Sequence, residues 1–304
     1  APPILFPQGP FNVEAQEALG RQVMELFQFD FDHGRLDVSL HPFSGGTPDD
    51  SRITTRYAED DFTQSLMAVV HETGHAQYER GLPKAWRGQP VGQSRGMAVH
   101  ESQSLLFEML AARSPEFIGY IAPTLRRVFG GSGPAWEDDN LVRLYHKVER
   151  GLIRVDADEV TYPLHVIHRY RLEKDMINGD LAVRNLPEAW NEGMRELMGV
   201  VPETDADGCL QDIHWPGGAF GYFPTYTLGA LGASQIFAAA KSQDDGIMAG
   251  IAKGDFSSLL TWLRANIHGN ACKLMPDQLI EQATGAPLGT AAFKTHLEAR
   301  YLRS

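Results

Sequence analysis

The stretch VVHETGHAQYE, residues 69–79, places His71 and His75 four residues apart, with Glu72 directly after the first histidine. On a helix, residues i and i+4 share a face, so both imidazoles can approach one metal ion. Glu72 lies one position round the helix, where it can reach a metal-bound water without being a ligand. This HExxH arrangement of two ligands and a general base predicts a metal-dependent hydrolytic site.

HExxH is short and also arises by chance, so an ordinary amphipathic helix with two histidines is the alternative. The flanking segments SLMAVV and AQY are apolar and predict a buried helix. A buried histidine pair with a carboxylate is costly unless these polar groups have partners. Gly74 also leaves room beside the histidines. Together these features favour the metal site.

A catalytic zinc needs a third protein ligand and one open position. HES at residues 100–102 offers Glu101, which lies 26 positions after His75 on the next expected helix. An antiparallel neighbouring helix at this separation could deliver a carboxylate to both histidines, with His100 as the competing candidate. Glu79 and Glu108 are candidates for accepting an imidazole N–H, although exposed helix carboxylates fit the same pattern.

The composition limits the possible functions. The 304 residues carry a net charge of −12 and contain 43% hydrophobic residues. The acidic balance, without any basic run, argues against nucleic acid and anionic membranes as partners. No apolar run reaches the length of a transmembrane helix, about 18 residues. Two cysteines, Cys209 and Cys272, do not make a disulfide framework, so reduced thiols and a cytoplasmic location are expected.

Periodicity predicts a mainly α fold with a minor sheet, in one continuous domain over residues 1–304. The chain begins with Ala, without the features of a signal peptide, so either the initiator was removed or the sequence starts mid-protein. The glycine- and proline-rich residues from 41 on predict a loop that leads into a short strand near 51–57. The expected helices cover residues 13–29, 61–79, 98 onward, 115–130, 136–150, 158–178, 187–198, 225–241, 255–267, 276–283 and 289–301.

Six short motifs occur in an order that resembles the carboxypeptidase Taq family of zinc metallocarboxypeptidases. They are HPF at 41–43, DSRIT at 50–54, HETGH at 71–75, HESQ at 100–103, IRVDAD at 153–158 and GCLQDIHW at 208–215. The resemblance implies a gluzincin-like metallopeptidase with a small β-sheet beside the active-site helix. Relative to the family, the chain lacks the N-terminal part, which is expected to be trimmed, lost or supplied by another chain.

The resemblance assigns His71, His75 and Glu101 as ligands of Zn²⁺ and Glu72 as the base. Co²⁺ is a possible substitute, since it accepts the same ligand set. The family is generally dimeric, so a homodimer is expected as well.

A carboxypeptidase must recognise the free C-terminal carboxylate of a peptide, and arginine suits this by forming a bidentate charged pair. Arg154 of IRVDAD is the first candidate and Arg52 of DSRIT the second. The alternative for either arginine is a structural ion pair with an acid such as Asp50, Asp158 or Asp212.

Peptide hydrolysis also builds negative charge on the former carbonyl oxygen, which a hydrogen-bond donor can stabilise. Related metallopeptidases pair a histidine with a downstream tyrosine for this task. Here His214 precedes Tyr222 and Tyr226, and the sequence does not choose between the two tyrosines. His100 is a candidate contact for the substrate backbone.

The predicted function is a zinc-dependent carboxypeptidase that removes C-terminal residues from peptides with a free C-terminus by attack of a metal-activated water. A metallo-endopeptidase or oligopeptidase with the same site is the first alternative, and amidated peptides would separate the two. An inactive remnant, or a subunit that needs a partner, is the second alternative.

Overall fold

The computed structural model describes residues 2–302 and forms two compact units. The first unit comprises Ala1–His146 and Gly229–Ser304, and the second comprises Lys147–Leu228. Helix α8 begins in the second unit and continues in the first. One continuous domain over residues 1–304 stays a prediction.

The fold is mainly helical with one small sheet, which confirms the predicted fold class. The helices are α1 (Val13–Leu26), α2 (Phe62–Gly81), α3 (Met97–Leu105), α4 (Pro115–Phe129), α5 (Asp138–Tyr145), α6 (Tyr162–Asn178), α7 (Leu186–Met198), α8 (Pro224–Gln243), α9 (Gly246–Ile251), α10 (Ser257–Asn266), α11 (Pro276–Thr284) and α12 (Ala291–Leu297). Two π-helical segments, Leu106–Ala112 and Glu298–Leu302, extend α3 and α12. Among the α-helices of residues 2–302, α9 is the one that periodicity does not predict, because six residues are too few for a helical pattern.

Three strands form the sheet: β1 (Gly34–Val38), β2 (Phe43–Thr47) and β3 (Asp50–Thr55), in the order β1-β3-β2. Strand β3 pairs parallel with β1 and antiparallel with β2. The strand expected near 51–57 is confirmed as β3, but the interpretation of the preceding residues as loop is wrong for β2. Its sequence FSGGT has low β propensity, so its pairing with β3 rather than its composition makes it a strand.

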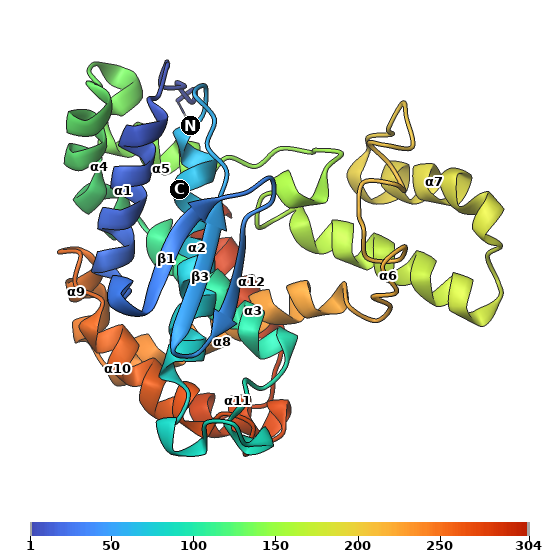
Figure 1. Cartoon of the computed structure of the whole chain (residues 1–304). Coiled ribbons are helices and arrows are strands. Elements are labelled where there is room, and N and C mark those ends of the chain that lie inside the picture. Colours follow the sequence, from blue (N-terminus) through green and yellow to red (C-terminus); the bar gives the residue numbers. More distant parts are fainter. Residues whose placement is uncertain (1, 303–304) are drawn as a thin grey trace. The chain divides into compact units, whose positions relative to one another are not determined.

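Helix α2 carries the HETGH motif and packs against the sheet (Figure 1). Its Val69 and Ala76 join Leu36 of β1 and Ile53 of β3 in a buried apolar cluster. The Asp61 side chain caps the helix by accepting a hydrogen bond from the backbone N–H of Thr63 at 2.7 Å. The sheet and the cap therefore fix the position of the helix that bears the two histidines.

Helix α3 lies against α2 at a separation that only glycine permits. A Cβ at Gly74 would lie 2.7 Å from Cα of Ser104 and 2.8 Å from the carbonyl oxygen of Gln103. Helix α8 also approaches α3 closely, since a Cβ at Gly229 of α8 would lie 2.6 Å from Cγ of Glu101. These two glycines let both neighbouring helices close on α3.

In the second unit, α6 and α7 form a helix pair around a small apolar core that includes Leu172, Trp190 and Met194. Helix α6 begins at Tyr162 rather than at the expected residue 158. The reason is that Pro163 lacks a backbone N–H and belongs in a first turn, where no helical partner is available.

A buried ionic network links the loops of the second unit to α6. Asp212 accepts hydrogen bonds from Arg154 at 2.7 Å and from Arg169 at 2.6 Å. Gln211 accepts one from Nη2 of Arg169 at 2.7 Å. Burial raises the pKa of Asp212, but the two guanidinium groups outweigh it and hold the pKa below its ordinary value.

Within residues 2–302, no helix has both the length and the apolar character that crossing a membrane requires.

We expect Gly74→Ala to lower the free energy of unfolding by about 1–3 kcal/mol, because the new methyl group would overlap backbone atoms of α3. The matched control is Gly119→Ala in α4, where a Cβ would meet no atom within 4 Å. That substitution should stabilise the protein by up to about 1 kcal/mol, the ordinary gain in a helix interior. Denaturant unfolding of both variants measures the difference, and equal effects would show that α2 and α3 are not in close contact.

We expect Asp212→Asn to cost about 3–5 kcal/mol at neutral pH, because it leaves two buried guanidinium groups without a counter-charge. The carboxylate has a lowered pKa in the folded state, so its contribution is present above the unfolded pKa and is lost as pH falls through the folded pKa. The difference in unfolding free energy between wild type and variant should therefore shrink in acid. A difference that does not depend on pH would contradict this account.

Candidate metal centre

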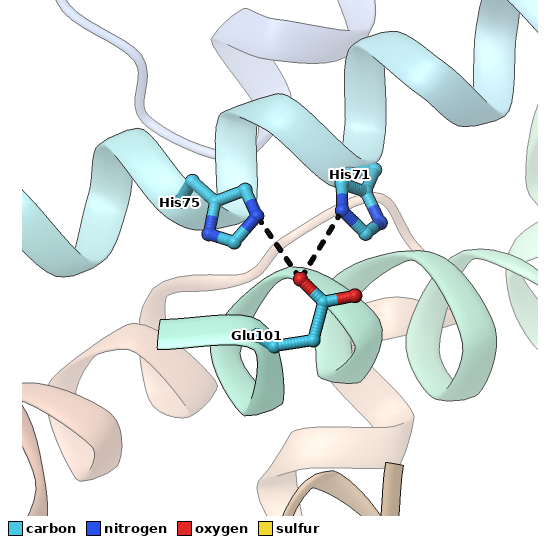
Figure 2. Close-up of side chains that lie close together, drawn as sticks. All are labelled: His71, His75 and Glu101. Atoms are coloured by element: carbon cyan, nitrogen blue, oxygen red, sulfur yellow. Dashed lines mark ion pairs between the residues drawn. The ribbon is translucent and has the colours of Figure 1, made fainter. Parts of the chain in front are cut away.

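Three predicted metal ligands converge in the first unit. His71 and His75 project from one face of α2, and Glu101 projects from α3 between them (Figure 2). A carboxylate oxygen of Glu101 lies 3.7 Å from Nε2 of His71 and 3.4 Å from Nε2 of His75. The ligand atoms of the three residues all lie within 4.8 Å of one another.

This spacing fits a small divalent cation. Donor atoms at about 2.1 Å from a tetrahedral zinc lie about 3.4 Å from each other. The observed separations of 3.4 and 3.7 Å between the Glu101 oxygen and the two histidine nitrogens are close to that value. Two imidazoles and one carboxylate also form a known ligand set of catalytic zinc, with the fourth position left open.

The other nitrogen of each histidine is already engaged. Nδ1 of His71 lies 2.9 Å from Glu108, which confirms one of the two carboxylates predicted to accept an imidazole N–H. Nδ1 of His75 lies 2.7 Å from Nδ1 of His100, and Nε2 of His100 lies 2.8 Å from Glu79. Glu79 therefore reaches His75 through His100 and not directly. Because the Nδ1 atoms are engaged, Nε2 of His71 and Nε2 of His75 are the ring nitrogens that face the Glu101 carboxylate.

Burial and neighbouring charges shift the pKa values of the three cluster residues. Burial lowers the pKa of His71, but Glu101 and Glu108 outweigh it and raise the pKa to about 10. Burial, with His71 nearby, lowers the pKa of His75 to about 4. Burial raises the pKa of Glu101, but His71 and His75 bring it below its ordinary value. The cluster thus combines negative charge with imidazoles, a suitable environment for a cation.

Glu72 is 8% exposed and follows His71 directly on α2. Burial raises the pKa of Glu72 to about 7, although His71 opposes the shift. A carboxyl group with a pKa near neutrality can both take up and release a proton during turnover. Its position and its titration both suit the predicted base.

The sequence does not indicate two parts of this arrangement. Arg113 hydrogen-bonds to Glu108 and so holds the partner of His71. It lies five residues beyond Glu108, directly after the π-helical segment Leu106–Ala112, and this spacing is not one that an α-helical pattern would indicate. Gly229 of α8, which makes room for Glu101, is separated from it by 128 positions and belongs to no motif.

The structure shows which residues the ring of His100 contacts. The sequence suggests a contact with the substrate backbone or a competing metal ligand. In the structure its two ring nitrogens face His75 and Glu79, while Glu101 is the residue that joins the histidine cluster. A role in substrate binding remains a prediction.

The remaining candidates in the second unit form a cluster of their own. Nε2 of His214 lies 2.9 Å from the hydroxyl of Tyr226, and its ring centroid lies 5.5 Å from that of Tyr222. The guanidinium of Arg154 lies 4.9 Å from the centroid of the Tyr226 ring. Burial and the charge of Arg154 lower the pKa of His214. Tyr226 is thus hydrogen-bonded to the histidine.

The two candidate arginines differ in their surroundings. Arg154 is 6% exposed and donates to Asp212 and Tyr162, so one of the structural ion pairs considered as alternatives is present. Arg52, on β3 in the first unit, is exposed and forms two hydrogen bonds with Asp50, both at 2.8 Å. Recognition of a substrate carboxylate by either residue remains a prediction.

The chain matches a family model described as carboxypeptidase Taq (M32) metallopeptidase over residues 1–301. It is 43% identical over 293 residues to thermostable carboxypeptidase 1 of Thermus thermophilus and 36% identical over 295 residues to carboxypeptidase 1 of Bacillus subtilis. These alignments cover 96% of this chain but 57% and 58% of the two relatives, so the chain spans less than two thirds of their length.

Solved structures agree with this result. Metallocarboxypeptidase 1 of Trypanosoma cruzi superposes with a TM-score of 0.96 at 45% identity, over 99% of this chain and 63% of that one. The M32 carboxypeptidase of Deinococcus radiodurans gives a TM-score of 0.92 at 39% identity, over 98% of this chain and 61% of that one. Sequence and fold together show that this chain belongs to the carboxypeptidase Taq (M32) family of metallopeptidases.

Proposed function

We propose that this chain carries the metal centre and general base of a zinc-dependent carboxypeptidase that removes C-terminal amino acids from peptides. The observation that carries the proposal is the convergence of His71, His75 and Glu101 with their ligand atoms within 4.8 Å of one another. The names of the relatives, all carboxypeptidases, support the same activity. The location is inferred to be cytoplasmic, and the expectation of a homodimer rests on the resemblance alone.

The same three residues would hold the metal. A bound zinc supplies a Lewis acid that polarises the scissile carbonyl and makes water acidic near neutral pH. The carboxylate and two imidazoles favour zinc, and cobalt fits the same donors. The neighbours of the ligands, Glu108 and His100, hold the two imidazole rings by their Nδ1 atoms.

Glu72 is the proposed proton carrier. It takes one proton from the attacking water as the new C–O bond forms and passes that proton to the departing amine as the C–N bond breaks. Its burial favours this cycle, because a carboxyl group with a pKa of about 7 gains and loses a proton at little cost. An exposed carboxylate with an ordinary pKa would return the proton less readily.

The candidate residues for recognising substrate other than the metal ligands and the base include Arg154, His214 and Tyr226, which lie in the second unit. The hydrogen bonds of Arg154 to Asp212 and Tyr162 use three of its five N–H groups. The fixed guanidinium retains donors for a carboxylate, which supports its proposed role at the substrate C-terminus. The pair of His214 and Tyr226 is proposed to stabilise the charge that develops on the carbonyl oxygen.

The test of this proposal is zinc content together with the hydrolysis of matched peptides with a free and an amidated C-terminus. We expect the zinc-loaded chain to release single amino acids from the free peptide and to leave the amidated peptide almost intact, because a carboxypeptidase recognises the terminal carboxylate. Equal cleavage of both peptides would favour the endopeptidase alternative. Zinc binding without cleavage of either would favour a subunit that needs a partner.

We expect Glu72→Gln to keep its zinc but to lose at least about 10²- to 10⁴-fold in kcat, the usual range for a general base. The amide has nearly the same shape but cannot accept the proton. Glu25→Gln, an exposed substitution on α1, is the control with the same change in charge. Kinetics near those of wild type in a zinc-replete Glu72→Gln preparation would exclude this role.

A further inference from the structure

The two histidines of the metal cluster are held in different ways. His71 is paired directly with a carboxylate, since its Nδ1 lies 2.9 Å from Glu108. His75 is paired with the imidazole of His100, which in turn is paired with the carboxylate of Glu79. The distances are 2.7 Å from Nδ1 of His75 to Nδ1 of His100 and 2.8 Å from Nε2 of His100 to Glu79.

The direction of hydrogen bonding in the second chain follows from the chemistry of imidazole. A histidine that binds a metal through Nε2 keeps its proton on Nδ1 when it is neutral. Two nitrogens 2.7 Å apart share one proton, so His75 donates and Nδ1 of His100 accepts. A neutral His100 then carries its proton on Nε2. That proton is donated to Glu79, whose ionised carboxylate only accepts.

We propose that His100 and Glu79 are positioning residues that fix the tautomer and ring orientation of His75 as a metal ligand. This inference rests on the proposed metal site. His100 would thus act behind the metal cluster rather than as a contact for the substrate. Glu79 would act through His100 on His75, although His75 and Glu79 lie only four residues apart on α2.

The surroundings of His100 restrict its ring. Tyr78 packs its ring edge-on at a centroid distance of 5.1 Å, and the side chain of His100 is 15% exposed. His100 also directly precedes Glu101 on α3. The approach of α3 to α2 therefore delivers a ligand and the partner of another ligand in two consecutive residues.

Side-chain substitutions at His100 should be accommodated locally. His100 and Glu79 border a cavity of about 120 Å³ between the helices and residues 44–47 of β2. Part of a change of size at this position can therefore be taken up by that cavity. Two replacements test the hydrogen-bonding role. Leucine removes both contacts, whereas the glutamine carboxamide can accept from His75 and donate to Glu79.

The experiment measures the dissociation constant of zinc by competition with a chromophoric chelator. We expect His100→Leu to weaken zinc binding about 10- to 100-fold, the range found when the partner of a ligating histidine is lost. His100→Gln should recover part of this loss. The matched control is His33→Leu, because His33 also pairs with a carboxylate, Asp30, at 2.8 Å, but is neither a member of the metal cluster nor one of the partners described above for its ligands. It should bind zinc as wild type does.

A second readout observes the tautomers directly. In the zinc-loaded, ¹⁵N-histidine-labelled protein, NMR should show His75 protonated on Nδ1 and His100 protonated on Nε2. A His100 proton on Nδ1 would overturn the proposed direction. A purely structural role predicts a lower melting temperature of the metal-free His100→Leu variant with an unchanged zinc dissociation constant, and this result would overturn the inference as well.

The outcomes separate this inference from the proposed function. Wild-type protein that binds no zinc would refute the metal site itself, and the positioning role with it. Wild-type protein that binds zinc, together with a His100→Leu variant that binds it equally well, would refute the positioning role alone.

Discussion

The close approach of α3 to α2 is the constraint on which the metal cluster depends. At Gly74, inside the HETGH motif, a single methyl group would overlap backbone atoms of α3. At Gly229 of α8, a methyl group would likewise overlap the side chain of Glu101. With a wider gap, the carboxylate could not lie 3.4 and 3.7 Å from the two histidine nitrogens. Gly74, the fourth residue of the motif, thus serves packing, while His71, Glu72 and His75 serve chemistry.

Close packing around charged groups creates an electrostatic cost that the surrounding residues offset. Isolated charges are expensive in a protein interior, but charges with hydrogen-bonding partners are tolerated. Arg113 and His71 share Glu108, and Glu79 supports His75 through His100. Glu108 lies within the π-helical segment that continues α3, and Arg113 follows that segment directly. A segment that departs from α-helical geometry therefore carries the carboxylate that supports His71.

The family motifs are divided between the two compact units. HPF, DSRIT, HETGH and HESQ lie in the first unit, and IRVDAD and GCLQDIHW lie in the second. Each unit contains a buried polar network of its own. In the second unit, Asp212 forms ion pairs with both Arg154 and Arg169. A motif arginine can therefore stabilise the fold and still present N–H groups to a ligand, so a structural and a functional role are compatible.

The sequence by itself determined the helical character of the chain, the family and the three residues that converge. Helical spacing places His71 and His75 on one face wherever the helix lies, because that relation is local. Motif order pointed to Glu101. Tertiary structure decided the rest, since those contacts join residues that are distant in sequence or have no pattern. The glycine-rich β2 is a strand only through pairing with β3. His100 bonds to Glu79 only because α3 packs on α2, and Gly229 matters only because α8 packs on α3.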